Sequence, residues 1–324
     1  MNTVAAHDQS KNGAAFVFPG SGVQYQEIYT TLKDNLFFQR HCQTAGIDGD
    51  RLFSEGNLTD DPVEAEQFTQ RLLYTICCAL CDDYKHHKTI LPTVVLGYSM
   101  GIYAALYAAE AYTFETGLSI LQTAFRLTRN LYTSKQGHTV GMGYILGLSE
   151  QDIVSLFAQI PSEMHIAAFN GEHSFVIVGD QEPLLWCLQT AEKLGAFRAQ
   201  RICTQFGYHT PLLQAIACDF RRFLHTCEIF PLSFPFLSST TLELSIHPAQ
   251  IIAELVQNMY SPIRWAEVIH RLFHHYKISR CYEIGPGDSL KKMTRYINRK
   301  IKFHQVYGGK DLQPAPFLGL NLPR

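Results

Sequence analysis

Residues 93–101 read TVVLGYSMG, and residues 102–112 after them read IYAALYAAEAY. The first stretch starts as a short buried strand and ends in a Gly-rich turn, whereas the second is Ala-rich and favours a helix. Ser99 is the centre of a G-x-S-x-G motif on that turn, where a tight strand-to-helix connection exposes the hydroxyl. The glycines let the turn close without a side-chain clash, and the helix N-terminus favours developing negative charge. We therefore interpret Ser99 as a nucleophile rather than as part of a turn alone.

Two further apolar stretches also run directly into a turn. They read AAFVFPGSG at residues 14–22 and CYEIGPG at residues 281–287. Between the first of them and the strand before Ser99, residues 62–85 carry apolar side chains at helical spacing. Strands that alternate with helices predict an α/β fold built on a mostly parallel sheet.

The middle of the chain has a different pattern, in which short strands outnumber helices. We predict strands at 143–148, 165–170, 174–180 and 197–202, and helices at 149–160 and 181–194. The resulting order is βαββαβ, which is the order of a ferredoxin-like unit. We therefore expect a small subdomain inserted into the larger α/β domain.

The composition limits the classes of protein that the chain can be. A length of 324 residues predicts about two domains or one domain with an insertion. With 46% hydrophobic and 17% charged residues, the chain is not of the disordered type. A net charge of -2 and the lack of a long apolar run argue against nucleic-acid and membrane partners. Nine cysteines without a disulfide framework predict a reducing, cytoplasmic location.

A serine nucleophile needs a base, and His209 is the best candidate among the 14 histidines. It lies in QFGYHTP, a loop bounded by glycine and proline directly before a predicted helix. Most other histidines, such as His86, His87, His274 and His275, lie in polar stretches that are typical of a solvated surface.

Several segments occur in the order in which one enzyme family has its signatures. These segments are AFVFPGSGVQY, LGYSMGIYAALYAAEAYTFETGL, AAFNGEHSFVIVGD, FGYHTPLL, MYSPIRW and YEIGPGDSL. Together they span roughly residues 14 to 300, nearly the whole chain. The chain thus resembles the acyltransferase family that includes malonyl-CoA:acyl-carrier-protein transacylases and polyketide synthase acyltransferase domains. The resemblance implies an α/β-hydrolase-like catalytic domain at 14–135 and 204–303, a ferredoxin-like subdomain at 136–203, and a C-terminal tail at 304–324.

The resemblance also implies a division of labour among the site residues. Ser99 would attack an acyl thioester and hold the acyl group as an ester, while His209 would serve as the base. The backbone carbonyl of Asn258 would orient His209, and the backbone N–H groups of Ser21 and Met100 would form the oxyanion hole.

The chain departs from the family where malonyl-type enzymes grip the carboxylate of their substrate. Counting from Phe114, the position of the family's arginine is Ala124. Arg126 and Arg129 are nearby, but on a helix they point about 160° and 140° away from that face. The carboxylate clamp is therefore expected to be absent, unless a displaced register lets one of these arginines reach the pocket. Other residues expected to shape the substrate pocket are Tyr98, Ile102, Asn170 and Tyr208.

The resemblance implies an acyl carrier protein as partner, with its phosphopantetheine or coenzyme A carrying the substrate, and no bound cofactor; we expect a monomer. Cys77, Cys78 and Cys81 include a C-x-x-C, but no fourth ligand at fitting spacing is evident, and packing inside a buried helix explains them better than zinc. A basic run has two interpretations, a solvated helix end or a docking face for the acidic carrier protein. Its candidate docking residues are Lys291, Lys292, Arg295 and Arg299.

Three functions follow from these patterns. The first is Ser-His ping-pong chemistry on acyl thioesters of carrier protein, with a preference for non-malonyl groups, as hydrolytic editing or transfer between carriers in polyketide or fatty-acid-type biosynthesis. The second is an ordinary malonyl-CoA:acyl-carrier-protein transacylase with its arginine displaced. The third is a non-catalytic carrier-binding module, which an intact Ser99 and His209 argue against.

Overall fold

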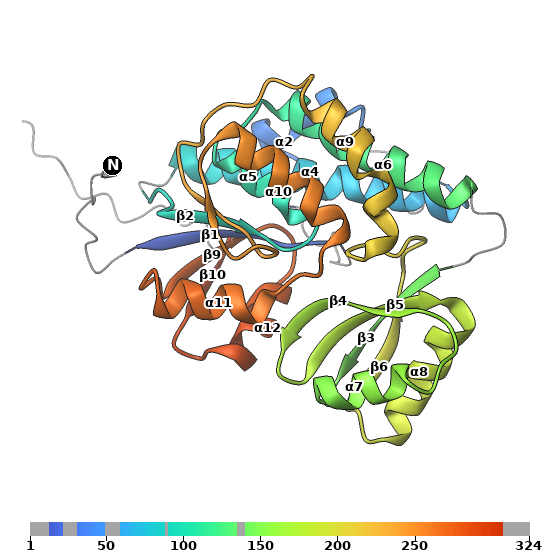
Figure 1. Cartoon of the computed structure of the whole chain (residues 1–324). Coiled ribbons are helices and arrows are strands. Elements are labelled where there is room, and N and C mark those ends of the chain that lie inside the picture. The colour runs from blue at the N-terminus through green and yellow to red at the C-terminus, as the bar shows by residue number, and fades with distance from the viewer. Residues whose placement is uncertain (1–12, 22–30, 49–58, 88–89, 135–139, 307–324) are drawn as a thin grey trace, which may run out of the picture.

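Two β-sheets organise the protein (Figure 1). The structure, a computed structural model, describes residues 13–21, 31–48, 59–87, 90–134 and 140–306. The main sheet has the strand order β10-β9-β1-β2-β7-β8, and all its neighbours are parallel except the pair β7 and β8. Its strands are β1 (Ala14–Phe18), β2 (Val94–Gly97), β7 (Phe236–Leu237), β8 (Leu244–Ser245), β9 (Arg280–Ile284) and β10 (Lys302–Val306). The predicted α/β fold with a mostly parallel sheet is confirmed.

The alternation of side chains along β1 divides the core of the main sheet into two layers. Phe16 and Phe18 face one layer, whereas Ala15 and Val17 face the other, as the period of a strand requires. The first layer is covered by α2 (Leu36–Ala45), α4 (Pro62–His87), α5 (Gly101–Ala108), α6 (Phe114–Ser134), the 3₁₀ helix η1 (Pro211–Ile216), α9 (Ala217–Leu224) and α10 (Pro248–Tyr260). The second is covered by α11 (Trp265–His274) and α12 (Ser289–Ile297), which Figure 1 shows on the opposite side of the sheet.

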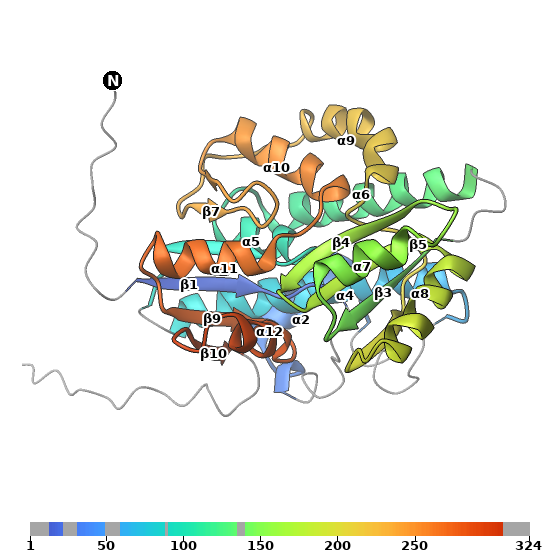
Figure 2. The same cartoon turned by 60° about the horizontal axis from the view of Figure 1, so that its bottom comes forward.

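The smaller sheet lies to one side of the main sheet in both views (Figures 1 and 2). It is antiparallel, with the strand order β4-β5-β3-β6. Its elements in chain order are β3 (Val140–Leu146), α7 (Glu150–Phe157), β4 (Met164–Gly171), β5 (Ser174–Asp180), α8 (Gln181–Lys193) and β6 (Arg198–Ile202). This is the βαββαβ order predicted from the sequence. One face packs on α7 and α8, and the other contributes Met142 and Val176 to the core shared with the main sheet.

Several boundaries differ from the sequence-based expectation; the helix expected at 149–160, for example, runs only from Glu150 to Phe157. The helix expected at 102–112 already ends at Ala108, and Glu110 holds a left-handed backbone with φ of 66°. The strand expected at 143–148 runs from Val140 to Leu146. The tail expected from residue 304 starts too early, because β10 pairs with β9 up to Val306; the rest of that tail lies outside the described residues.

Candidate active site

Ser99 lies on a sharp turn, and the turn leaves room only for glycine two residues before it and two residues after it. Gly97 ends β2 and Gly101 begins α5. A Cβ on Gly97 would lie 2.3 Å from the backbone carbon of Gly101, and a Cβ on Gly101 would lie 2.2 Å from the carbonyl oxygen of Phe18. Ser99 itself has φ of 54°, in the left-handed region that non-glycine residues rarely adopt. The two glycines therefore bring the start of α5 against β1 and leave Ser99 at the apex of the turn.

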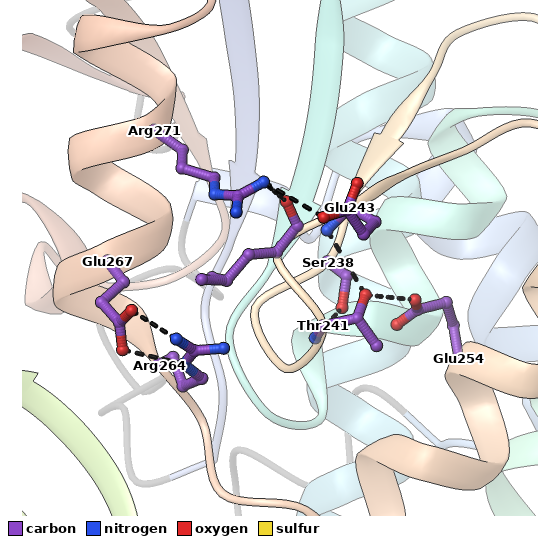
Figure 3. Close-up of polar contacts among 8 residues, drawn as sticks. Ser238, Thr241, Glu243, Glu254, Arg264, Glu267 and Arg271 are labelled. Atoms are coloured by element: carbon purple, nitrogen blue, oxygen red, sulfur yellow. Dashed lines mark hydrogen bonds and ion pairs between the residues drawn. The ribbon is translucent and has the colours of Figure 1, made fainter.

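The loop between β7 and β8 is hydrogen-bonded to this turn. Ser239 Oγ donates a hydrogen bond to the carbonyl oxygen of Gly97 over 3.2 Å. Figure 3 shows how α10 and α11 hold the loop: Thr241 Oγ1 donates to Glu254 Oε1 at 2.7 Å, and Arg271 Nη1 donates to the Leu242 carbonyl at 2.9 Å. The position of Ser99 is thus fixed through a chain of contacts that leads to both helices.

The side chains of Ser99 and His209 are directly hydrogen-bonded. Ser99 Oγ lies 2.7 Å from His209 Nε2, and His209 Nδ1 lies 2.8 Å from the carbonyl oxygen of Asn258. A carbonyl only accepts, so Nδ1 carries the proton and Nε2 is free to accept one from the hydroxyl. The His209 N–H donates to the Met259 carbonyl at 3.1 Å, which fixes the backbone as well as the ring. Asn258 therefore lies where the sequence places an orienting carbonyl.

Burial sets the protonation state of His209. The residue is only 6% exposed, and desolvation lowers the pKa of its imidazole to about 4, although its hydrogen bonds to the backbone of Asn258 and Ser261 act in the opposite direction. The ring is consequently neutral at neutral pH. A neutral imidazole that accepts from a serine hydroxyl can take up the proton when that hydroxyl attacks an electrophilic carbonyl.

Two cavities meet at this pair. The inner cavity has a volume of about 50 Å³ and extends from Ser99 and His209 to Leu121, Ala124 and Phe125 of α6. The outer cavity has a volume of about 530 Å³ and lies between the main sheet and the smaller one. Its wall includes Tyr98, Met142, Ala168, Val176, Tyr208 and Ile263. A small, mostly apolar cavity and a much larger one therefore adjoin at the Ser99–His209 pair.

On α6, Ala124 faces the inner cavity and the two nearby arginines do not. Ala124 is 4% exposed and lines the inner cavity, whereas Arg126 and Arg129 are exposed to solvent. Among the described residues that line either cavity there is no lysine or arginine. Neither of the two arginines thus replaces a clamp at Ala124.

Tyr98 and Tyr208 line the outer cavity, as expected for pocket residues, but two other expectations were wrong. Ile102 is 2% exposed and belongs to the core of the main sheet, and it lines neither cavity. Asn170 is buried behind the wall, where its Oδ1 accepts from the Tyr98 hydroxyl at 3.0 Å. Asn170 positions a wall residue and does not itself line either cavity.

Ser21 and Met100 lie next to each other at the site. Ser21 lines both cavities, and its Oγ donates to Met100 Sδ over 3.8 Å. Met100 is the residue directly before the first turn of α5. Backbone N–H groups at the start of a helix have no acceptor within the helix and point toward its N-terminus. The arrangement is suited to binding an oxygen that gains negative charge beside Ser99.

Sequence reasoning missed a hydrogen-bonded group on α4. Glu66 accepts from Thr204 Oγ1 at 2.8 Å, from the Gln205 N–H at 2.7 Å and from the Tyr208 hydroxyl at 2.9 Å. Gln70 Nε2 donates to the Tyr208 hydroxyl at 3.1 Å. Burial raises the pKa of Glu66, while these hydrogen bonds act to lower it. The sequence gives little indication of this group, since EQFTQ at residues 66–70 is an ordinary polar stretch of a helix.

The other groups of interest lie away from the two cavities. Cys77, Cys78 and Cys81 are buried in α4, as predicted, and burial raises the pKa of each thiol. In the described part of the chain, no three His, Cys, Asp or Glu side chains gather closely enough to hold a metal ion. The basic residues Lys291, Lys292, Arg295 and Arg299 are exposed on and just after α12. Lys292 Nζ forms an ion pair with Asp288 Oδ1 at 2.7 Å.

No described helix combines the length and the apolar character that crossing a bilayer requires.

Comparisons with known proteins agree on one family. The family described as "Acyl transferase domain" matches residues 15–286. A malonyl CoA-acyl carrier protein transacylase of Bacillus subtilis is 26% identical over 314 residues, which cover 93% of this chain and 95% of the relative. The polyketide biosynthesis protein ThaF of Burkholderia thailandensis is 26% identical over 288 residues, 87% of this chain but only 24% of ThaF. The solved structure of the malonyl CoA-acyl carrier protein transacylase of Coxiella burnetii has a TM-score of 0.80 and 25% identity, and the match covers 91% of this chain and 94% of that one.

Proposed function

Because the chain belongs to the acyl transferase domain family, we propose that it transfers acyl groups between the thioester of an acyl carrier protein and an acceptor, through an ester on Ser99. The observation that carries this proposal is the hydrogen bond of 2.7 Å between Ser99 Oγ and a neutral, buried His209. A binding module without catalysis would have no need for this pair, for the carbonyl of Asn258 behind it, or for a cavity that ends at it.

The reaction has two halves that use the same proton carrier. Ser99 Oγ attacks the thioester carbonyl while its proton passes to His209 Nε2, and the thiol of the carrier leaves with that proton. In the second half, His209 removes a proton from the acceptor, which attacks the ester, and the proton returns to Ser99. The backbone N–H groups of Ser21 and Met100 stabilise the negative oxygen in both halves, and one such donor is worth about 10²–10³ in rate.

We propose that the acyl group is not malonyl. The inner cavity presents Ala124 where malonyl enzymes need a cation. Burying a carboxylate without a partner costs more than the roughly 2–7 kcal/mol of an unpaired neutral polar group. The names of the relatives support the second candidate, an ordinary malonyl transacylase. The cavities do not, because no described lysine or arginine lines them.

The relationship to ThaF supports a place in polyketide biosynthesis, where acyl groups on carrier proteins are edited or passed on. In this account the substrate arrives on phosphopantetheine or coenzyme A, and the protein is a monomer without a bound cofactor. We propose that the acidic carrier protein docks on the exposed basic residues on and just after α12. These residues are Lys291, Lys292, Arg295 and Arg299.

We also interpret the two sheets as two folding units. The main sheet with its flanking helices corresponds to an α/β-hydrolase-like domain, 14–135 and 204–303 extended by β10. The βαββαβ segment within 136–203 corresponds to a ferredoxin-like subdomain. The outer cavity between them would then narrow or widen with any movement of one unit against the other.

Intact-mass spectrometry tests the proposed function. The protein is mixed with a panel of acyl-pantetheine thioesters, and the mass of the protein is followed over time with and without an added holo carrier protein. We expect an adduct with the mass of the acyl group in the wild type and none in Ser99→Ala. An adduct that decays in buffer alone identifies a hydrolase, and one that decays only with the carrier identifies a transferase. No adduct with any thioester would contradict the proposal.

A further inference from the structure

We propose that Glu66 is a specificity-determining residue that keeps acyl groups bearing a carboxylate away from Ser99. This inference rests on the proposed function and goes beyond it, because it adds an active exclusion to the missing cation at Ala124. The substrate class that it selects is the neutral acyl thioester.

Glu66 faces the cavity that leads to the nucleophile. It lies on the first turns of α4 and lines the same outer cavity as Ser99, Tyr208 and His209. A thioester must pass through this cavity to reach Ser99, since the cavity between the two sheets is the wider of the two that meet there.

Hydrogen bonds hold the Glu66 carboxylate in the cavity wall. Every side-chain or backbone partner of Glu66 donates to it: the Thr204 and Tyr208 hydroxyls, the Gln205 N–H and, at 3.5 Å, the Gln70 amide. Burial raises the pKa of Glu66, but donors on both oxygens act against that shift and fix the side chain to the loop that carries His209. The negative charge therefore cannot swing out of the cavity wall without breaking these bonds.

The described lining of the two cavities holds no cation that would balance the charge of Glu66. Asp60 is a second acid on the cavity wall, and the described lining of both cavities contains no lysine or arginine. The nearest basic residue along α4, Arg71, lies over the ring of Phe68, 5.5 Å from its centre, and is not part of either wall. The negative charge of Glu66 would repel a carboxylate on an acyl group, whereas it would not repel the neutral isostere of that group.

The test separates charge from size by using two probes of similar shape, the malonyl thioester of pantetheine and its methyl ester. The rate of Ser99 acylation is measured for both in single turnovers, and the ratio of malonyl to methyl ester is compared among variants. Glu66→Gln keeps the shape and one acceptor but removes the charge. We expect this ratio to rise roughly tenfold or more, with the methyl-ester rate changed only a few-fold.

The matched control is Glu64→Gln, an exposed acid on the same turn of α4 that lines neither cavity, and it should leave the ratio unchanged. A second variant, Thr69→Lys, adds a cation to the outer cavity without touching the bonds of Glu66, and should also raise the ratio.

A ratio that stays constant in Glu66→Gln would overturn the inference while leaving the proposed function intact, whether or not Thr69→Lys changes it. An equal fall of both rates in Glu66→Gln is such a result, because Glu66 would then only position the loop of His209. A wild type that is acylated by acetyl-pantetheine but by neither probe would overturn the inference, because the neutral isostere would then be excluded as well. A wild type that no thioester acylates would contradict the proposed function, and this inference would fail with it.

Discussion

Ser99 and His209, 110 residues apart in the chain, are joined by a hydrogen bond of 2.7 Å, and both hold left-handed backbones, with φ of 54° and 60°. A non-glycine residue in this region stores about 1–2 kcal/mol of steric strain. Both strained residues carry the reactive atoms of the site. The surrounding structure, two glycines for Ser99 and the Met259 carbonyl for His209, holds them in place.

Replacing the nucleophile should separate catalysis from stability. Ser99→Ala is expected to lose all acyl-enzyme formation and to keep the fold, since alanine fits the same turn. Ser99→Gly should be more stable than Ser99→Ala by about 1 kcal/mol, because glycine adopts positive φ without strain. Urea denaturation followed by circular dichroism measures this difference. Equal stability of the two variants would show that the turn is not strained.

The buried His209 should make stability depend on pH in a defined window. Its pKa is about 4 in the folded protein and 6.5 for the unperturbed side chain, so the unfolded state binds more protons between these values. Stability therefore falls as the pH decreases from about 6.5 to about 4, by on the order of 3 kcal/mol. His209→Asn, which tolerates positive φ and does not titrate, should lack this component. Parallel slopes for the two proteins in that window would contradict the assignment.

The same pKa sets the pH profile of acylation. The rate should rise with pH through about 4, where His209 becomes neutral and able to accept the serine proton, and not through 6.5. His209→Asn should lower the rate by several orders of magnitude and remove this rise. Single-turnover acylation rates measured from pH 3.5 to 8 show whether the rate rises near pH 4, as expected, or near pH 6.5, which would contradict the low pKa of His209.

Restoring the cation should change the preference for the acyl group. Ala124→Arg points a guanidinium into the inner cavity and should raise kcat/KM for malonyl relative to acetyl thioesters by tenfold or more, about 1.4 kcal/mol. Arg126→Ala and Arg129→Ala are the controls, because both arginines are exposed on other faces of α6 and their loss should leave the ratio unchanged. A lower malonyl rate in Arg126→Ala would place that arginine at the pocket.

The turn around Ser99 should tolerate no Cβ at Gly101. Gly101→Ala places a Cβ 2.2 Å from the Phe18 carbonyl oxygen, so α5 must move away from β1. We expect a loss of about 3 kcal/mol in the free energy of unfolding, as for overpacking of a core. Gly171→Ala is the control, because its Cβ would have its nearest neighbour at 3.8 Å. Urea midpoints of the two variants test this difference.

The sequence was sufficient for the features that depend on local chemistry. The G-x-S-x-G turn, the loop of His209 and the position of Ala124 on α6 all depend on spacing along one segment, and the structure has them where expected. The βαββαβ order likewise follows from short-range alternation of apolar side chains.

The features that the sequence did not reveal depend on contacts between distant segments. Glu66 and Gln70 look like solvated positions of a helix, and only the fold brings them against residues 204–208. Ile102 looked like a pocket residue because it follows the motif, but the packing of α5 buries it in the core. The low pKa of His209 comes from its burial in the folded protein, which no local pattern encodes.

The central claim is that Ser99 takes a neutral acyl group from a thioester, and a competition experiment tests it most directly. Wild-type protein is mixed with equal concentrations of acetyl- and malonyl-pantetheine, and the adduct is identified by intact mass within one turnover and located by peptide mapping. The account predicts an acetyl ester on Ser99 in large excess over the malonyl ester, and no adduct in Ser99→Ala. A predominant malonyl ester, or an adduct that persists in Ser99→Ala, would contradict it.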